Sequence, residues 1–421
     1  MIRRLMALFL VLLSAPALAQ KPAQNVGDTV RIRIEELPPP DATPAVSNKP
    51  VPVERPARQP LRVPQGYKAT LFRDHVENAR NLLALPDGGV LVAQQKPGTL
   101  TLLRDLDRNG EADEEWVWAA GFDKPYGLAF HEGFVLVADL EGVWRLPWRE
   151  GAAAAQGERR LITPPGALGT GAVAGDGHDT RSLAVAPDGR HLYVGVGSAA
   201  NIAEEEPPRA TIQEFPMDGG IDGDGGRSFA TGLRNPVGMA FRPGTNDLYA
   251  VVNERDGMGD GLVPDFLTRI ERDSFYGWPY AYLGPHPQPD FADRRPDLVE
   301  TAVTPDVLFE AHSAPLGMVF TDGMDGPERF RKGALVALHG SSSRSEPVGY
   351  TVVFVPFEGK RPAGGYEVFA SGFRVAGEDS RPTVWGRPAG LAVARDGSLL
   401  IADSLGSVWR VSYVGNRKRR G

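Results

Sequence analysis

The sequence predicts an all-β fold, a six-bladed β-propeller preceded by a signal peptide and a proline-rich linker. Three observations support this. The 421 residues include 50 glycines and 37 prolines, and this excess favours a turn-rich fold over a helical bundle. One short hydrophobic sequence motif recurs six times along the chain. No amphipathic pattern of helical length competes with it.

The first 65 residues are expected to lie outside the propeller. Residues 1–19 are typical of a signal peptide, with Arg3 and Arg4 before an apolar run and small residues before Gln20. The run is too short to span a bilayer, so we expect a periplasmic or secreted protein rather than a membrane-anchored one. Residues 20–65 carry nine prolines from position 38 onward, which predicts a mostly disordered linker.

The six copies of this sequence motif place the blades within residues 66–414. Each copy reads as an apolar strand, a turn and a second apolar strand, which is the pattern of a β-hairpin. Six copies predict six blades, each of which buries its faces only against its neighbours. The copies begin at Asn81, Tyr126, Arg181, Val237, Leu316 and Ala389. Residues 415–421 are expected to be a solvated basic tail.

Composition excludes several functional classes. The net charge of −7 argues against nucleic acid or an anionic membrane as a partner. The absence of cysteine excludes disulfides, thiolate nucleophiles and iron–sulfur clusters. Catalysis must therefore use other side chains or a bound cofactor.

Three polar segments stand at the same place in the repeat, immediately before its first strand. They contain His178, the pair Arg234 and Asn235, and Arg387. The pseudo-symmetry of a propeller would direct all three to one mouth of the central channel. Each residue taken alone is more often a solvated turn residue, and their shared position makes the functional interpretation about as favourable.

The chain resembles the pyrroloquinoline quinone (PQQ)-dependent sorbosone dehydrogenases and soluble quinoprotein glucose dehydrogenases over residues 66–414. The order of the motifs carries the resemblance. The matching stretches are Gly232–Phe241, Asn253–Asp260, Tyr276–Pro279, Ala311–Gly317, His339–Ser341 and Trp385–Pro388. The resemblance implies oxidation of a sugar, aldose or related alcohol by hydride transfer to PQQ, with electrons passed to a soluble acceptor such as a cytochrome or quinone.

The resemblance also implies roles for individual residues. His178 would be the general base, and Arg234 would stabilise the charge that develops on the quinone oxygen. The residues implied in cofactor binding are Asn235, Arg387, His339, Asn201 and Arg181. A calcium ion beside PQQ is implied at the Asn253–Asp256 turn, bound largely through main-chain carbonyls. The residues expected to form its site are Glu254, Arg255 and Asp256, with Asp265 as a support for the loop.

Several positions depart from the family. Ser198 replaces an aspartate that orients the histidine, which leaves Asp176 or Asp179 as substitutes. His339 replaces a lysine, and Ser342 with Ser343 replaces a Trp-Asn pair. Two alternatives therefore stay open, a calcium-dependent propeller lactonase or esterase and a non-catalytic propeller that binds a partner in the cell envelope.

Two further features remain ambiguous. The segment from Asp105 to Gly110 opens like a calcium-binding EF-hand loop but lacks the final glutamate, which favours an ordinary turn. His312 could face the channel or be a hydrogen-bonded histidine within a blade.

Overall fold

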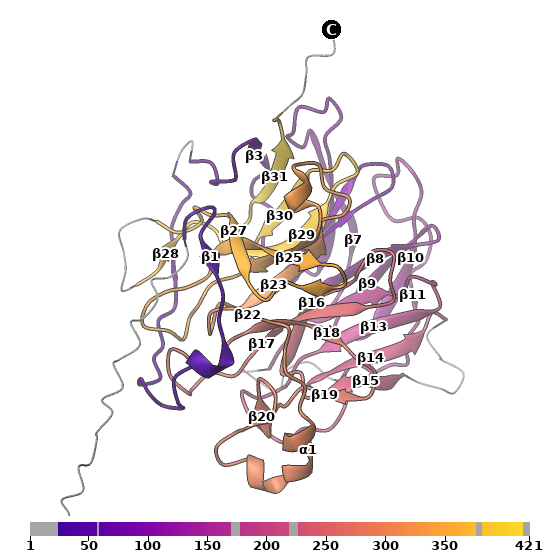
Figure 1. Cartoon of the computed structure of the whole chain (residues 1–421). Coiled ribbons are helices and arrows are strands. Elements are labelled where there is room, and N and C mark those ends of the chain that lie inside the picture. Colours follow the sequence, from indigo (N-terminus) through magenta and orange to yellow (C-terminus); the bar gives the residue numbers. More distant parts are fainter. Residues whose placement is uncertain (1–23, 57–58, 170–176, 219–225, 376–380, 416–421) are drawn as a thin grey trace, which may run out of the picture.

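The computed structural model describes residues 24–56, 59–169, 177–218, 226–375 and 381–415, and it confirms the six-bladed propeller (Figure 1). The predicted signal peptide and most of the basic tail lie outside these residues. Each blade is an antiparallel sheet whose first strand lies nearest the channel. The blades contain these strands: β4 (Ala79–Ala84), β5 (Val90–Gln94), β6 (Thr99–Arg104) and β7 (Glu114–Ala120); β8 (Gly127–His131), β9 (Phe134–Ala138), β10 (Val143–Pro147) and β11 (Arg160–Leu161); β12 (Arg181–Val185), β13 (His191–Val196), β14 (Thr211–Pro216) and β15 (Arg227–Thr231); β16 (Asn235–Phe241), β17 (Leu248–Asn253), β18 (Phe266–Ile270) and β22 (Val307–Leu308); β23 (Pro315–Phe320), β24 (Gly333–Leu338), β25 (Thr351–Glu358) and β27 (Tyr366–Ala370); β29 (Pro388–Val393), β30 (Leu399–Asp403), β31 (Val408–Tyr413) and β3 (Tyr67–Arg73).

The sixth blade closes the ring with strands from both ends of the fold. Strand β3 pairs antiparallel with β31, so that Tyr67 lies opposite Tyr413 and Arg73 opposite Val408. The first propeller strand in the sequence therefore forms the outer edge of the last blade.

The inner strands of neighbouring blades approach each other closely, which explains the glycine in the repeated sequence motif. A Cβ atom on Gly317 would lie 2.3 Å from the carbonyl oxygen of Ala389, and one on Gly390 would lie 2.9 Å from the carbonyl oxygen of Arg80. Side chains do not fit at these contacts. The residue before each of these positions therefore occupies an equivalent place around the channel.

These equivalent residues fill the centre of the molecule. Four of them form one buried apolar cluster: Tyr126, Val237, Leu316 and Ala389. The first and third repeats place Arg80 and Arg181 at this position instead. We call these six residues the plug.

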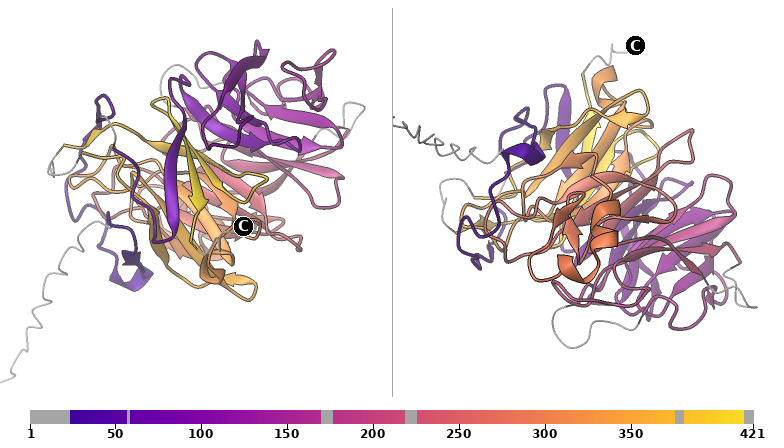
Figure 2. Two further views of the ribbon diagram at one scale, coloured as in Figure 1. Left: turned by 90° about the horizontal axis from the view of Figure 1, so that it is seen from above. Right: turned by 60° about the horizontal axis from the view of Figure 1, so that its bottom comes forward.

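The N-terminal leader differs from the expected mobile linker. In residues 24–65, β1 (Thr29–Val30) adds to the edge of blade five and β2 (Val51–Pro52) pairs with β28 (Thr383–Val384). Val30 and Leu61 are buried. The proline density correctly argues against internal sheet or helix, but proline is compatible with extended segments that dock on edge strands. Figure 2 shows this indigo segment running beside the orange and yellow blades.

The longest excursion from the blades lies between β17 and β23. It contains β19 (Ser274–Phe275), β20 (Ala281–Tyr282), β21 (His286–Pro287), the 3₁₀ turn η2 (Ala292–Arg294) and α1 (Pro296–Thr301). Two further 3₁₀ turns are η1 (Ile34–Glu36) and η3 (Glu328–Phe330), and β26 (Arg361–Pro362) pairs with β25. Figure 1 shows α1 and β20 projecting from one side of the propeller. In the described part of the chain, no helix has the length and apolar character needed to cross a membrane.

Candidate active site

His178 lies just before β12, and a main-chain carbonyl fixes its orientation. Its Nδ1 is 2.9 Å from the carbonyl oxygen of Ser198 and 3.2 Å from the Ser198 hydroxyl, which itself donates to Ala200 at 2.6 Å. A carbonyl can only accept, so Nδ1 carries the proton and Nε2 keeps its lone pair. Ser198 therefore supplies the orienting contact, while Asp179 forms an ion pair with Lys124. Asp176 lies outside the described residues.

Burial keeps His178 neutral. The loss of hydration lowers the pKa of His178 to about 3, and the positive charge of Arg234 acts in the same direction. A neutral imidazole with a free Nε2 is the form that a general base requires.

Arg234 is held by oxygen acceptors that carry no net charge. Its Nε donates to the carbonyl of Asn201 at 3.0 Å, and its Nη2 donates to the Asn201 side chain at 2.9 Å. Its Nη1 donates to the carbonyl of Glu254 at 2.7 Å. The guanidinium is buried and fixed, and no carboxylate of the described residues contacts it. Its charge therefore remains available to an anionic group.

Asn235 and His178 meet on either side of Gly197. A Cβ on Gly197 would lie 2.5 Å from Asn235 Oδ1 and 2.6 Å from His178 Cβ, so only glycine fits between them. Asn235 is buried, and its Oδ1 has no hydrogen-bond partner among the described residues. A buried acceptor without a donor is costly and indicates a missing ligand or water.

Arg387 and His339 form the opposite part of the site. Arg387 Nη2 donates to the carbonyl of Gly340 at 2.9 Å, its Nε donates to the carbonyl of His339 at 3.2 Å, and its main-chain N–H donates to Asp403 at 2.6 Å. His339 Nδ1 lies 3.0 Å from the carbonyl of Pro388. Burial and the nearby arginines lower the pKa of His339, so this histidine does not replace the charge of the lysine in the glucose enzymes.

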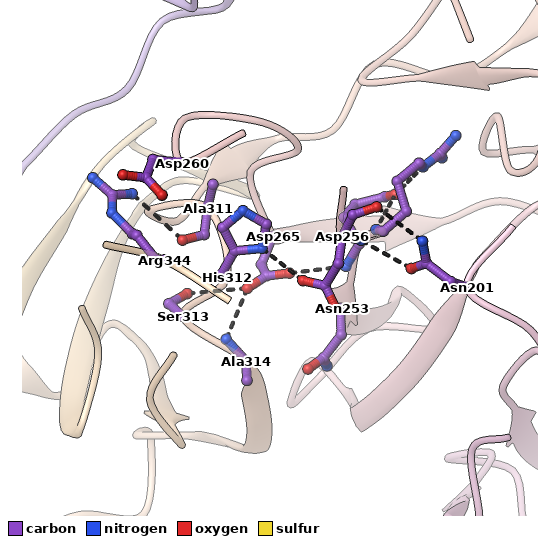
Figure 3. Close-up of polar contacts among 12 residues, drawn as sticks. Asn201, Asn253, Asp256, Asp260, Asp265, Ala311, His312, Ser313, Ala314 and Arg344 are labelled. Carbon is purple, nitrogen blue, oxygen red and sulfur yellow. Dashed lines mark hydrogen bonds and ion pairs between the residues drawn. The ribbon is translucent and has the colours of Figure 1, made fainter. Parts of the chain in front are cut away.

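Asn201 connects two blades. Its Nδ2 donates to the carbonyl of Asp256 at 2.8 Å, and its Oδ1 accepts the main-chain N–H of Asp256 at 2.9 Å (Figure 3). The indole N–H of Trp278 donates to the Asn201 carbonyl at 3.1 Å. The structure thus places Asn201 as a support for Arg234 and for the 253–256 turn.

Arg181 also supports the site, through hydrogen bonds to main-chain carbonyls. It is fully buried, its Nε donates to the carbonyl of Leu168 at 3.0 Å, and its Nη1 donates to the carbonyls of His178 and Thr180 at 3.0 and 2.9 Å. These contacts hold the main chain of His178.

The carboxylates implied in the calcium site are each engaged within the protein. Glu254 Oε2 forms a buried ion pair with Arg255 at 2.9 Å, and Arg255 also donates to Gln288. Glu254 Oε1 is buried without a hydrogen-bond partner among the described residues. Asp265 accepts the main-chain N–H groups of Glu254 and Ala314, both at 2.8 Å (Figure 3). Burial raises the pKa of Asp265 to about 7. These contacts fix the turn but leave no converging set of carboxylates.

His312 is hydrogen-bonded at both ring nitrogens. Nδ1 lies 2.8 Å from Asp256 Oδ1 and Nε2 lies 2.9 Å from the carbonyl of Gly259 (Figure 3). Although burial opposes the charged form, the contacts with Asp256 and Gly259 raise the pKa of His312. The structure therefore favours the interpretation of His312 as a satisfied, structural histidine.

The EF-hand-like segment lies far from these residues in the fold. Asp105, Asp107 and Asp113 come close together in the β6–β7 turn, and they are the one group of three potential metal ligands in the described ranges. Asp105 forms an ion pair with Arg410 at 2.7 Å and accepts main-chain N–H groups of its own turn.

Sequence reasoning missed four residues around the site. Trp278 supports Asn201, Asp403 fixes the backbone of Arg387, and Tyr126 and Arg80 belong to the plug. The signal for Tyr126 was present, since it opens its copy of the repeat. Arg80 precedes the copy that begins at Asn81, and its equivalence depends on the irregular β4–β5 pairing between Ala79 and Asn81.

Comparisons with known proteins now bear on this geometry. The model of the TrAA12-like family matches residues 61–264 and 291–414. The chain belongs to the TrAA12-like family. This agrees with the resemblance to the PQQ-dependent sugar dehydrogenases.

Individual relatives of this TrAA12-like chain are distant. The PQQ-dependent pyranose dehydrogenase of Coprinopsis cinerea is 26% identical over 71% of this chain, and the match spans 45% of that enzyme's length. An uncharacterized protein of Borreliella burgdorferi is also 26% identical, over 84% of this chain and 91% of its own.

Solved structures share the fold. The holo form of the PQQ domain of the Coprinopsis cinerea pyranose dehydrogenase has a TM-score of 0.69 at 21% identity and covers 86% of this chain and 99% of its own. The calcium structure of the Trichoderma reesei AA12 enzyme has a TM-score of 0.69 at 19% identity, covering 84% and 97%.

Proposed function

We propose that this protein is a periplasmic or secreted PQQ-dependent dehydrogenase that oxidises a sugar, aldose or related alcohol and passes electrons to a soluble acceptor. The observation that carries the proposal is the assembly of His178, Arg234, Asn235 and Arg387 at one end of the inner strands. Their chemistry matches the requirements of an anionic quinone and of a hydroxyl substrate. The distant relatives named above support the same reaction class.

The residues fit PQQ on two features of the structure. Asn235 Oδ1 is buried without a donor, and Arg234 and Arg387 carry charges that no contacting carboxylate neutralises among the described residues. Arg387 can present a planar guanidinium to a carboxylate, and Arg234 can present one to a quinone oxygen. PQQ contains both kinds of acceptor and, when bound, would supply the hydride-accepting quinone.

The protein's own contribution is proton transfer and electrostatics. His178 Nε2 would accept the proton of the substrate hydroxyl, because the Ser198 carbonyl holds the proton on Nδ1. Arg234 is already fixed by Asn201 and Glu254, so it would stabilise developing negative charge without first having to reorganise.

A side-chain calcium site does not fit the 253–265 segment. Glu254 Oε2 and both carboxylate oxygens of Asp265 have internal partners, and the carbonyl of Glu254 already accepts a hydrogen bond from Arg234. Glu254 Oε1 is buried without a partner among the described residues, but a single carboxylate oxygen does not make a calcium site. A cation there would depend on main-chain carbonyls. For this reason no step of the proposed reaction uses calcium.

The alternative of a calcium-dependent lactonase loses support on the same ground. Such an enzyme needs a channel metal held by several carboxylates or amides. In the part of the chain that the structure describes, the three clustered aspartates lie in the β6–β7 turn, away from His178 and Arg234.

The test is a PQQ titration of the purified apoprotein, followed by absorbance and by a dye-linked assay with a panel of aldoses. We expect saturable PQQ binding and aldose oxidation. The matched control is His178→Gln, which should bind PQQ normally but lose activity by about 100-fold or more because the base is absent. An apoprotein that neither binds PQQ nor oxidises any aldose would overturn the proposal.

A further inference from the structure

Arg80 is a cation on the inner strand β4 for which the described residues provide no partner. It lies on β4 at an irregularity in the pairing with β5, between Ala79 and Asn81, and such irregularities redirect side chains. Its Nε is buried and has no hydrogen-bond partner. Among the residues that the structure describes, its guanidinium makes no hydrogen bond and no ion pair. Its five N–H donors therefore have no acceptor among these residues, although the side chain as a whole is half-buried and only Nε is fully enclosed.

The groups around Arg80 provide no negative charge. Those that interact with it electrostatically are Tyr126, His339 and Arg387. Burial raises the pKa of Tyr126 to about 12, so this phenol is neutral. His339 is held neutral, and Arg387 is a second cation. The surroundings of Arg80 are thus positive without a counter-charge.

Arg181 shows what an arginine does at this position when its role is structural. It occupies the equivalent place in the third repeat, and its Nε and Nη1 donate to three main-chain carbonyls, which leaves only Nη2 without a partner among the described residues. Arg80 has none of these contacts. Because a buried N–H donor without an acceptor is destabilising, the position of Arg80 Nε favours a role outside folding.

We infer that Arg80 binds a carboxylate group of the bound cofactor together with Arg387, on the side of the channel formed by the first and sixth blades. This inference rests on the proposed function, since PQQ supplies the carboxylate. Arg80 acts here as a binding residue and does not touch the reacting hydroxyl. Two guanidinium groups around one carboxylate would also compensate for the missing charge at His339.

The experiment compares Arg80→Met and Arg80→Lys with the wild-type protein. PQQ affinity is measured by titration, and thermal unfolding is measured for the apoprotein and for the PQQ-loaded protein. We expect Arg80→Met to weaken PQQ binding by about 10- to 100-fold, the range for hydrogen bonds to charged groups. Arg80→Lys should recover part of that loss because it restores the charge without the planar fork.

The apoprotein provides the second readout. Arg80→Met should unfold at the same temperature as wild-type apoprotein or at a higher one, because an unpaired cation has been removed. The matched control is Arg395→Met, which removes an exposed arginine bound to the Pro86 carbonyl and should leave PQQ affinity unchanged.

Three outcomes would overturn the inference, and they are distinguishable. If wild-type protein binds PQQ and Arg80→Met binds it equally well, Arg80 is not a ligand, but the proposed function stands. If Arg80→Met lowers the unfolding temperature of the apoprotein, Arg80 has a structural role. If wild-type protein binds no PQQ, the proposed function and this inference both fail.

Discussion

At the scale of single residues, His178 depends on one main-chain contact for its tautomer and on burial for its charge state. The carbonyl of Ser198 holds the proton on Nδ1 at 2.9 Å. A carbonyl is a weaker orienting group than the aspartate it replaces, because it does not stabilise the imidazolium that forms when the base accepts a proton.

We predict that His178 stays neutral down to about pH 3 in the folded apoprotein. The unfolded chain has the ordinary histidine pKa near 6.5. Between pH 6.5 and about 3 the unfolded state therefore binds more protons, so this residue reduces the free energy of unfolding as the pH falls through that window. The measurement is a histidine NMR titration, with the His178→Gln variant used to assign the resonance. A folded-state midpoint near pH 6.5 would contradict the prediction.

The limits of sequence reasoning are clearest at this scale. His178, Arg234, Asn235 and Arg387 could be found because the repeat places them at equivalent positions. The partners of charged residues could not, since they depend on loops that are distant in sequence. Asp256, for example, meets His312, 56 residues away. The sequence shows that both residues are charged or polar but not that each satisfies the other.

At the scale of elements, the leader contributes a strap across two loops of the site. We define the strap as residues 41–48. Asp41 and Thr43 bond to the 258–260 loop, with distances of 3.1 Å to the carbonyl of Met258 and 2.7 Å to the N–H of Asp260. Asn48 bonds to the 342–345 loop, and the two loops meet where Ser345 donates to Asp260 at 2.9 Å.

The strap also contacts one of the two positions at which the family resemblance marks a departure. Asn48 donates its main-chain N–H to the carbonyl of Ser342, one of the two serines that stand in place of the Trp-Asn pair. The six-fold hairpin repeat could be predicted because turn chemistry and alternation are local. The docking of the strap could not, because it depends on the acceptors offered by distant loops.

We predict that Asn48→Ala lowers the free energy of unfolding by about 1 kcal/mol and increases amide exchange in the 342–345 loop. The substitution removes side-chain hydrogen bonds to the carbonyls of Arg344 and Ser345, at 3.2 and 3.1 Å. The measurement is urea unfolding combined with hydrogen exchange. Asn246→Ala, at an exposed turn position, is the control. Equal effects of the two substitutions would show that the strap does not hold the loop.

At the scale of the whole molecule, the ring of blades is closed by the first strand of the propeller in the sequence. Strand β3 completes the sixth blade, and its side chains Tyr67 and Phe72 are buried in the clusters that join this blade to its neighbours. The leader before it adds contacts at the edges but does not close the ring.

We therefore predict different results for two truncations. A chain that starts at residue 60 should keep a cooperative unfolding transition, because β3 remains. A chain that starts at residue 75 should lose that cooperativity and bind a hydrophobic dye, because the edge of β31 and the core behind it become exposed. The measurements are circular dichroism melting and dye fluorescence. Cooperative unfolding of the shorter chain would contradict this account of closure.

The plug has a consequence for the order of events during turnover. Tyr126, Val237, Leu316 and Ala389 form one buried cluster on the inner strands, so on the proposed function they leave no passage through the centre of the ring. On the proposed function, reductant and oxidant must use the same entrance. The sugar and the electron acceptor would then bind in alternation, and the oxidised sugar would leave before the acceptor binds. An excess of sugar would inhibit binding of the acceptor, and an excess of acceptor would inhibit binding of the sugar.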